Sequence, residues 1–354
     1  MTILYFVILL SVIVTIHEFG HLIAAKIFGV YCFEFSIGMG PLLWKKKTKE
    51  TQYSIRALPI GGYVSMAGET DGDQMYPDVA VPEGRRLTEA KTWKRIIIML
   101  AGVTMNFLLA WLIFSLCALY SGSIGTAPDA TIGEVVAGSP AEAAGLMAGD
   151  KIIKIVDANG AVCKPETFAD MQIFTAQNEK ELTYTVVREG EELTVTMTPR
   201  LDEESGRYLI GIISTTGGVV PVNLLNCWYY GFTEMAAVSR ALLMVLRALF
   251  HGSGLGNLSG PIGIYEATET YAAMGIMAFL LLMAQISVNV GIFNLLPLPV
   301  LDGGQIVITL CEAALHRTIS ERVKQIILAA CWVLLIGIML FATFNDITRI
   351  FFQS

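Results

Sequence analysis

The sequence predicts a multi-pass α-helical membrane protein with membrane-associated β-hairpins and one inserted α/β domain. Two observations lead to this fold class. Of the 354 residues, 54% are hydrophobic and only 16% are charged, whereas about 25% of the residues in a typical soluble domain are charged. In addition, several long windows are almost free of ionisable side chains, and a helix needs about 20 such residues to cross the hydrocarbon core.

The apolar windows predict four membrane helices, at residues 2–25, 96–120, 272–301 and 326–344. The first could instead be a secretory signal peptide. It lacks a basic N-terminal region, however, and cleavage at Ala24-Ala25 would remove the histidines discussed below. We therefore expect it to be retained as a membrane helix.

The distribution of charge predicts the orientation. Residues 26–95 carry eleven Lys and Arg, and residues 121–271 carry nine Lys and Arg against eighteen Asp and Glu. Because basic loops stay on the cytoplasmic side, we expect 26–95 to be cytoplasmic and the acidic segment and both termini to lie outside. The net charge of −7 also argues against a nucleic-acid partner.

The first loop, 30–66, is predicted to form β-hairpins. Residues 51–56 alternate between polar and apolar, and glycines and prolines interrupt the flanking sequence. A hairpin beside a membrane site offers an edge to which an extended peptide can add as a further strand; an ordinary cytoplasmic loop is the alternative. Residues 68–86 are acidic and contain glycine, which predicts a flexible linker.

The outer segment predicts a small α/β domain at 125–205. A strand at 131–136 precedes a short helix that Ser139 can cap and Pro140 can start. A turn at Gly149-Asp150 then enters a strand, and 183–188 and 193–198 form a closing hairpin. This order resembles a PDZ domain of the kind associated with bacterial proteases, which implies either a site for a peptide end or a filter of substrate size.

The predicted domains are therefore 1–120, the N-terminal half of the membrane core; 125–205, the PDZ-like domain; 206–271, a linker with an interfacial helix at 235–250; and 272–354, the C-terminal half of the core. Arg240 and Arg247 favour a helix on the membrane surface, because as a fifth span it would leave both without partners in lipid. The six cysteines show no metal-binding spacing, and pairing of Cys163 with Cys227 stays open.

The first membrane helix contains the motif H-E-x-x-H, as His17-Glu18-Phe19-Gly20-His21. Histidines four residues apart on a helix can bind one metal ion, and the glutamate beside them can act as general base. Ionisable groups in a membrane helix cost about 2.5–3.5 kcal/mol each, so an idle cluster there would be destabilising. The motif therefore predicts a catalytic zinc site.

A catalytic zinc ion has three protein ligands and one open position, so one ligand is missing from the motif. Asp302 is the only acidic residue between 272 and 309, and it follows Pro297 and Pro299, which stop the third membrane helix. Gly303-Gly304 lets the backbone approach another segment closely. Asp302 is thus the expected third ligand; a loop aspartate at the membrane edge is the alternative.

In this order, H-E-F-G-H, A-G-V-T-M-N-F at 101–107, the PDZ-like insert and N-L-L-P-L-P-V-L-D-G-G at 294–304 resemble the site-2 protease family (peptidase family M50-like), specifically its bacterial RseP/RasP-type intramembrane zinc metalloproteases. The resemblance implies one Zn²⁺ per chain, held by His17, His21 and Asp302, with Glu18 as base. It implies that Asn294 holds the substrate strand, and that 35–41 and 58–64, which include Gly61 and Gly62, form the family's membrane-reentrant hairpin, where the substrate also binds.

The family's substrates are membrane segments of single-span proteins, commonly anti-sigma factors or remnant signal peptides, cut in regulated intramembrane proteolysis. By the same resemblance the chain is a multi-pass protein of the bacterial inner membrane, with its active site towards the cytoplasm. Val103 stands where the family often has proline, which leaves the role of Asn106 open. A metal transporter and an inactive PDZ scaffold remain alternative functions.

Overall fold

The computed structural model describes residues 2–125, 128–176, 178–202, 207–215, 217–250, 260–315, 317 and 319–352. The chain divides into two compact units, 1–120 with 224–354 and 121–223. Each unit has a hydrophobic core of its own.

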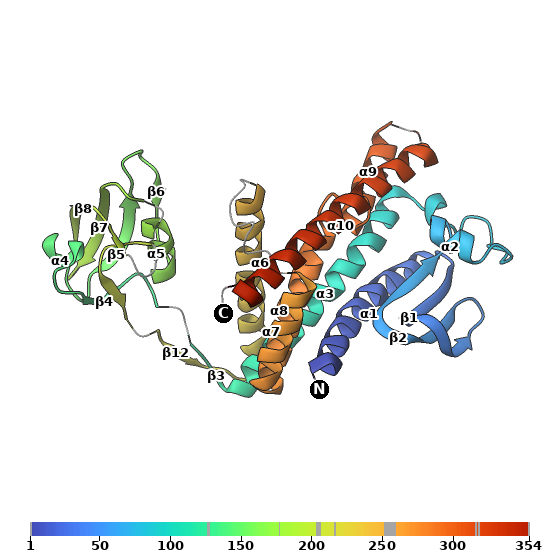
Figure 1. Cartoon of the computed structure of the whole chain (residues 1–354), viewed down its shortest axis with the longest axis horizontal. Coiled ribbons are helices and arrows are strands. Elements are labelled where there is room, and N and C mark those ends of the chain that lie inside the picture. Colours follow the sequence, from blue (N-terminus) through green and yellow to red (C-terminus); the bar gives the residue numbers. More distant parts are fainter. Residues whose placement is uncertain are drawn as a thin grey trace. The chain divides into compact units, whose positions relative to one another are not determined.

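Helices α1 (Thr2–Phe28), α3 (Thr92–Ser121), α8 (Ile276–Asn294) and α10 (Glu321–Phe352) form the frame of the first unit (Figure 1). Within the described residues, these are the four helices long and apolar enough to cross a membrane, as the sequence predicted. Leu9 of α1, Phe114 of α3 and Phe279 of α8 meet in one buried cluster. Packing between these helices therefore fixes where the polar side chains of α1 lie.

The predicted hairpin is present as β1 (Cys32–Lys47) and β2 (Gln52–Met66), which lies beside α1 (Figure 1). Residues Glu34 to Ile37 of β1 each have two partners in β2, so that Phe35 pairs with both Tyr53 and Val64. The first half of β1 is therefore central, and the last part of β2 forms an outer strand next to α1.

Residues 68–86 are not the flexible linker that their composition predicted. They contain α2 (Thr70–Met75), followed after Arg86 by the short helix η1 (Leu87–Glu89). Tyr76 donates a hydrogen bond to buried Glu34, and Arg85 binds Glu50 through two hydrogen bonds of 2.6 and 3.0 Å. The segment is ordered because its polar residues have specific partners in the hairpin, which its local composition does not reveal.

The third membrane helix, α8 (Ile276–Asn294), is shorter than the predicted range 272–301, and α7 (Pro261–Ala273) precedes it as a separate helix. Gly275, with φ of +108°, separates them. Asp346 of α10 accepts hydrogen bonds from the amides of Gly260 and Gly263 at the start of α7. Helix α6 (Cys227–Phe250) begins earlier than the predicted surface helix, and α9 (Asp302–Leu315) follows the break after α8.

The second unit contains a four-stranded sheet of order β6-β5-β7-β8, with one short helix before β5 and another between β6 and β7. Its core includes Ile152, Tyr184 and Met171. The elements are β4 (Ile132–Val135), α4 (Pro140–Ala143), β5 (Lys151–Val156), β6 (Val162–Cys163), α5 (Phe168–Ala176), β7 (Leu182–Arg188), β8 (Glu191–Met197), β9 (Arg200–Asp202), β10 (Arg207–Leu209) and β11 (Ile212–Ser214).

The ends of this unit pair with each other as β3 (Ser123–Gly125) and β12 (Val219–Pro221). Strands β10, β11 and β12 lie in the segment that the sequence predicted to be part of a linker, and β11 pairs with β4. The predicted cap of α4 is confirmed, since the Ser139 hydroxyl accepts a hydrogen bond from the Glu142 amide at 3.2 Å. The six cysteines all lie among the described residues and none forms a disulfide bond, so Cys163 and Cys227 are not paired.

Candidate active site

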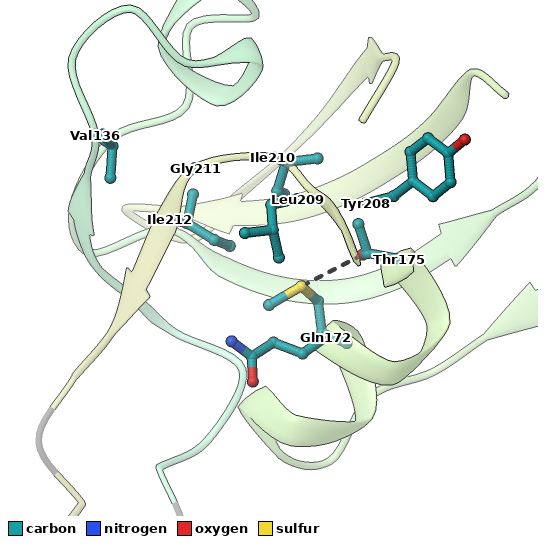
Figure 2. A pocket seen from close by; sticks show the side chains of 9 residues that line it. Val136, Gln172, Thr175, Tyr208, Leu209, Ile210, Gly211 and Ile212 are labelled. Atoms are coloured by element: carbon teal, nitrogen blue, oxygen red, sulfur yellow. Dashed lines mark hydrogen bonds between the residues drawn. The ribbon is translucent and has the colours of Figure 1, made fainter. Parts of the chain in front are cut away.

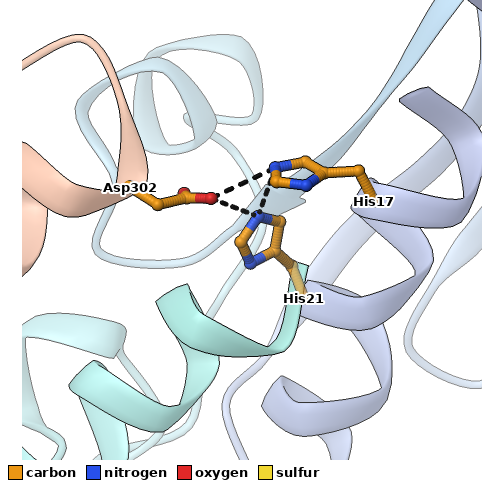
Figure 3. Close-up of side chains that lie close together, drawn as sticks. All are labelled: His17, His21 and Asp302. Carbon is orange, nitrogen blue, oxygen red and sulfur yellow. Dashed lines mark hydrogen bonds and ion pairs between the residues drawn. The ribbon is translucent and has the colours of Figure 1, made fainter. Parts of the chain in front are cut away.

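The structure brings His17, His21 and Asp302 together (Figure 3). Both histidines project from α1 and are buried, with 7% and 5% of their surface exposed. Asp302 is the first residue of α9. Its Oδ2 atom lies 3.1 Å from His17 Nε2 and 3.4 Å from His21 Nε2, and the two Nε2 atoms lie 3.2 Å apart.

These separations fit a tetrahedral metal ion. With metal–ligand bonds of about 2.0–2.2 Å, two ligand atoms at neighbouring corners of a tetrahedron lie about 3.3 Å apart. Asp302 Oδ2 is also buried and accepts no hydrogen bond of good geometry from the described residues. A buried carboxylate oxygen without a hydrogen bond is costly, and a cation between the three atoms would remove this cost. The donor set therefore suits Zn²⁺.

Helix α3 orients both imidazole rings. His21 Nδ1 lies 2.8 Å from the carbonyl oxygen of Ile98, and His17 Nδ1 lies 3.3 Å from the side-chain amide nitrogen of Asn106. Because each Nδ1 faces α3, each Nε2 faces Asp302. The Asn106 Oδ1 atom is buried without a hydrogen-bond partner among the described residues. Exchanging the oxygen and nitrogen of this amide lets His17 Nδ1–H donate to Oδ1, as is needed when Nε2 of the ring binds a metal.

Glycines allow α3 to approach the histidines. A Cβ atom on Gly102 would lie 2.5 Å from His21 Nε2 and 2.8 Å from His17 Cε1. A Cβ on Gly20, inside the H-E-x-x-H motif, would collide with the backbone of Ala101. Gly102 could not be singled out from the sequence, since its importance depends on which helix packs against α1.

Glu18 is partly buried on α1 and faces β2. Its Oε2 atom accepts a hydrogen bond of 3.0 Å from the backbone amide of Val64. The outer strand of the hairpin thus holds the carboxylate next to the two histidines. Sequence reasoning missed this partner, because a backbone amide leaves no trace in residue identity.

The three residues predicted to bind substrate lie in two different elements. Gly61 and Gly62 belong to the last part of β2; Gly61 has φ of +81°, and a Cβ on Gly62 would lie 2.6 Å from the Ser36 carbonyl oxygen. Asn294 is the last residue of α8 and is partly exposed. Among the described residues, no hydrogen bond joins Asn294 to the histidines or to Asp302, so its role stays a prediction.

The turn between α8 and α9 positions Asp302. The side chain of Gln305 donates a hydrogen bond of 2.7 Å to the Pro299 carbonyl oxygen, and the backbones of Gly303 and Gly304 touch the carbonyl groups of the turn, as their lack of side chains predicted.

The other end of α9 is held by Glu312, which pairs with Arg95 of α3 at 3.4 Å and with Lys324 of α10 at 3.0 Å. Burial raises the pKa of Glu312, but the hydrogen bonds from Lys324 and the Ile319 amide, together with the charges of Lys324 and Arg95, lower it below its ordinary value. The ion pairs connect α9 to the helix that orients the histidines.

The second unit contains a separate pocket of about 180 Å³ (Figure 2). It lies between Met171, Gln172 and Thr175 of α5 and the chain from Tyr208 to Ile212, and Val136 completes its wall. Most of its lining is apolar. No histidine, cysteine or carboxylate lines it.

The chain is similar to known proteins over nearly its whole length. The model of Peptidase family M50 matches residues 5–338. A putative zinc metalloprotease of Clostridium perfringens is 33% identical over 350 residues, covering 98% of each chain. The regulator of sigma-W protease RasP of Bacillus subtilis is 31% identical over 427 residues, and a putative zinc metalloprotease of Staphylococcus aureus is 29% identical over 434 residues, each covering 99% of both chains.

Among solved structures, the PDZ domain of an SdrC-like protein from Listeria monocytogenes matches 25% of this chain and 90% of its own length. The match has 18% sequence identity and a TM-score of 0.21, too low to establish a fold.

Proposed function

The chain belongs to peptidase family M50, and from this premise we propose that it is an intramembrane endopeptidase that cuts the membrane segments of single-span proteins. The names of its relatives and its four apolar helices support a bacterial membrane zinc metalloprotease. The observation that carries the proposal is the convergence of His17, His21 and Asp302 beside an apolar helix.

One Zn²⁺ per chain would be held by His17 Nε2, His21 Nε2 and Asp302 Oδ2. Bound there, zinc supplies a Lewis acid that polarises the scissile carbonyl and acidifies a water molecule. Glu18 takes the proton of the attacking water and returns it to the leaving amine. The Val64 amide keeps the Glu18 carboxylate from rotating away during these transfers.

The substrate must be extended before it is cut, because a helix occupies its carbonyl groups in its own hydrogen bonds. The outer strand of β2, with Gly61 and Gly62, offers an edge close to Glu18 on which an extended substrate can pair. Asn294, at the end of α8, would hold the same substrate strand. The substrates we propose are single-span proteins such as anti-sigma factors or remnant signal peptides.

In the proposed topology, α1, α3, α8 and α10 cross the bilayer, and the active site lies towards the cytoplasm. The 121–223 unit lies outside as a PDZ-like domain that either binds a peptide end in its pocket or filters substrates by size. Helix α6 lies at the outer surface against the core; Trp111 Nε1 donates a hydrogen bond of 2.8 Å to the Trp228 carbonyl oxygen. Aromatic residues of this kind are enriched at membrane interfaces.

Replacement of the base tests the function. The Glu18→Gln variant should bind zinc as the wild type does but lose cleavage of a model single-span substrate by at least about 10³-fold, because no group accepts the water proton. Zinc content and cleavage are measured on the same purified protein in detergent. A zinc transporter or a PDZ scaffold would cleave the substrate with neither residue at position 18. Normal cleavage by Glu18→Gln would refute the assignment of Glu18 as the general base.

A further inference from the structure

The outer part of β1 and the turn after it expose a continuous run of apolar and basic side chains. Every residue from Met39 to Lys49 is exposed. The most exposed large apolar side chains are Leu43, at 69%, and Trp44, at 51%, and Leu58 of β2 adds to the patch. Proteins rarely leave a contiguous apolar patch of this kind in water, so a further partner is expected to cover it.

The hairpin runs along α1 for most of a membrane thickness. At one end, Glu50 pairs with Lys26 at 3.4 Å; at the other, the Pro59 carbonyl accepts a hydrogen bond from Ser11. The helix between Ser11 and Lys26 is about 22 Å long at 1.5 Å per residue. The hydrocarbon core is about 30 Å thick. If α1 crosses the bilayer, the hairpin reaches into the same bilayer.

The strand register orders the exposed side chains by depth. Lys47 pairs with Gln52 and Lys45 with Ser54, close to the end marked by Glu50. Trp44 pairs with Ile55, and Met39 pairs with Leu58, towards the end marked by Pro59. The order from the end of α1 towards its middle is therefore lysine, tryptophan, aliphatic. The same order occurs in a bilayer from headgroup through interface to acyl chains.

The protein does not neutralise these lysines. Among the described residues, no ion pair involves Lys45, Lys46, Lys47 or Lys49. Glu50, the nearest acidic residue in sequence, is already bound by Arg85 and Lys26. A row of unpaired positive charge at headgroup depth complements an anionic lipid surface.

We infer that residues 39–49 are a lipid-binding edge, whose apolar half contacts acyl chains and whose lysines bind the headgroups of anionic phospholipids. This inference rests on the proposed function in one respect, that α1 crosses the bilayer. The lipid-binding edge would set the depth of the hairpin in the bilayer. The hairpin carries both the Val64 amide that holds Glu18 and the strand edge proposed for the substrate. Proteolysis should therefore depend on anionic lipid.

The experiment places the full-length, zinc-loaded protein in vesicles of phosphatidylcholine alone or of phosphatidylcholine with an equal amount of phosphatidylglycerol. The variant is Lys45→Gln, Lys46→Gln and Lys47→Gln combined. The matched control removes the same charge from exposed lysines of the other unit by combining Lys154→Gln, Lys164→Gln and Lys180→Gln.

Lipid contact is measured without reference to activity. Brominated phosphatidylglycerol quenches nearby tryptophan, and the difference between the wild type and Trp44→Phe isolates the signal of Trp44 among the five tryptophans. We expect quenching of Trp44 by brominated phosphatidylglycerol to exceed that by brominated phosphatidylcholine at least about twofold. The preference should disappear in the triple lysine variant and persist in the control.

Cleavage of a single-span substrate is measured in the same vesicles. It should be about tenfold faster with anionic lipid, and added salt and the triple variant should each remove this gain. Equal quenching of Trp44 in both lipids would overturn the inference. The inference would also be overturned if the triple lysine variant kept the preference of Trp44 for phosphatidylglycerol and lost affinity only for substrates with acidic flanks. Lipid-selective quenching without cleavage in any vesicle would refute the proposed function and leave the lipid-binding edge standing.

Discussion

Asn106 orients the imidazole ring of His17 so that its Nε2 atom faces Asp302. Its side chain lies 3.3 Å from His17 Nδ1, on the side of the ring away from Asp302. A hydrogen bond to Nδ1 fixes the tautomer and ring orientation of a histidine that binds metal through Nε2. The sequence placed Asn106 on the second apolar helix but did not reveal its partner.

The Asn106→Leu variant should bind zinc about 10- to 100-fold more weakly, the usual cost of losing a hydrogen-bonding partner of a metal ligand. Affinity is measured by competition with a colorimetric chelator in detergent. The control is Thr104→Val, because the Thr104 hydroxyl is exposed and, within the part of the chain that the structure describes, bonds only to the Leu100 carbonyl of its own helix. Unchanged affinity in Asn106→Leu would show that α3 orients His17 without this amide.

Asp150 is a buried carboxylate that stabilises the second unit through an ion pair with the partly exposed Arg188. Only 1% of its surface is exposed, and it accepts two hydrogen bonds of 2.7 Å from Arg188 and one of 2.9 Å from the Met147 amide. The hydrogen bonds from Arg188 hold the pKa of Asp150 below its usual value, which is about 3.9 in an unfolded chain. This pair joins the Gly149-Asp150 turn to the closing hairpin.

Asp150→Asn should therefore destabilise the second unit near neutral pH and much less in acid. A carboxyl group whose folded pKa is lowered contributes stability above the unfolded pKa, and this contribution is lost as the pH falls through the folded pKa. We expect amide exchange in β5 and β7 to accelerate about tenfold or more at pH 7, with a smaller effect in acid, once the pH has fallen through the folded pKa of Asp150.

The measurement is hydrogen exchange by mass spectrometry on the full chain, with rates corrected for intrinsic exchange at each pH. Glu192→Gln serves as control, because Glu192 is an exposed carboxylate in the same hairpin. An acceleration of equal size at both pH values would contradict the ionic origin of the effect.

At the scale of elements, the contact between α1 and α3 creates the candidate metal site. Gly20 and Gly102 let the two helices approach until α3 touches both imidazole rings. Small residues serve this purpose between membrane helices, where close packing rather than burial from water drives association. The hydrophobicity of the two helices was evident from the sequence, but the face by which they meet was not.

Gly102→Ala should weaken zinc binding by at least about tenfold, because overpacking costs about 1–3 kcal/mol and here the added methyl group displaces the ligands themselves. The matched control is Gly337→Ala in α10, where an added Cβ meets no atom within 4 Å. Zinc affinity and thermal stability are measured for both. If both variants bind zinc equally well, α3 does not pack on the histidines as the structure describes.

The hairpin shows what local pattern can and cannot predict. Alternation and glycine spacing predicted β1 and β2, because strand formation depends on nearby residues. The pairing of Phe35 with both Tyr53 and Val64 depends on how β2 folds back across β1, which no local signal encodes. For the same reason, the order in 68–86 was missed, since its partners Glu34 and Glu50 lie far away in sequence.

At the scale of the whole molecule, the second unit is inserted into the first through a paired double strand. Residues Ser123 and Pro221 are partners in this pairing, and the Val222 amide donates a hydrogen bond of 2.9 Å to the Gly122 carbonyl oxygen. The two ends of the insertion are therefore adjacent, so the unit can be removed without stretching the chain that remains.

Excision of residues 124–220, closed with a short glycine linker, should leave zinc binding unchanged within about twofold, because the metal ligands and their partners belong to the first unit. Cleavage is then compared for single-span substrates with and without a bulky folded outer domain. Faster cleavage of the bulky substrate would support a size filter, and slower cleavage of both would support docking of a peptide end. Loss of zinc binding would contradict the independence of the two units.

The sequence by itself determined the class of the molecule and the chemistry of its site. Hydrophobicity identified four helices, and the rarity of ionisable residues within or directly after them indicated His17, His21 and Asp302, because such residues are costly in an apolar setting. Only the tertiary structure decided how these residues meet. Three features depend on packing between distant segments: α3 approaches the histidines, the Val64 amide binds Glu18, and Asp302 lies beside His21 although 281 residues separate them in sequence. Such contacts are set by shape and backbone geometry rather than by any local pattern.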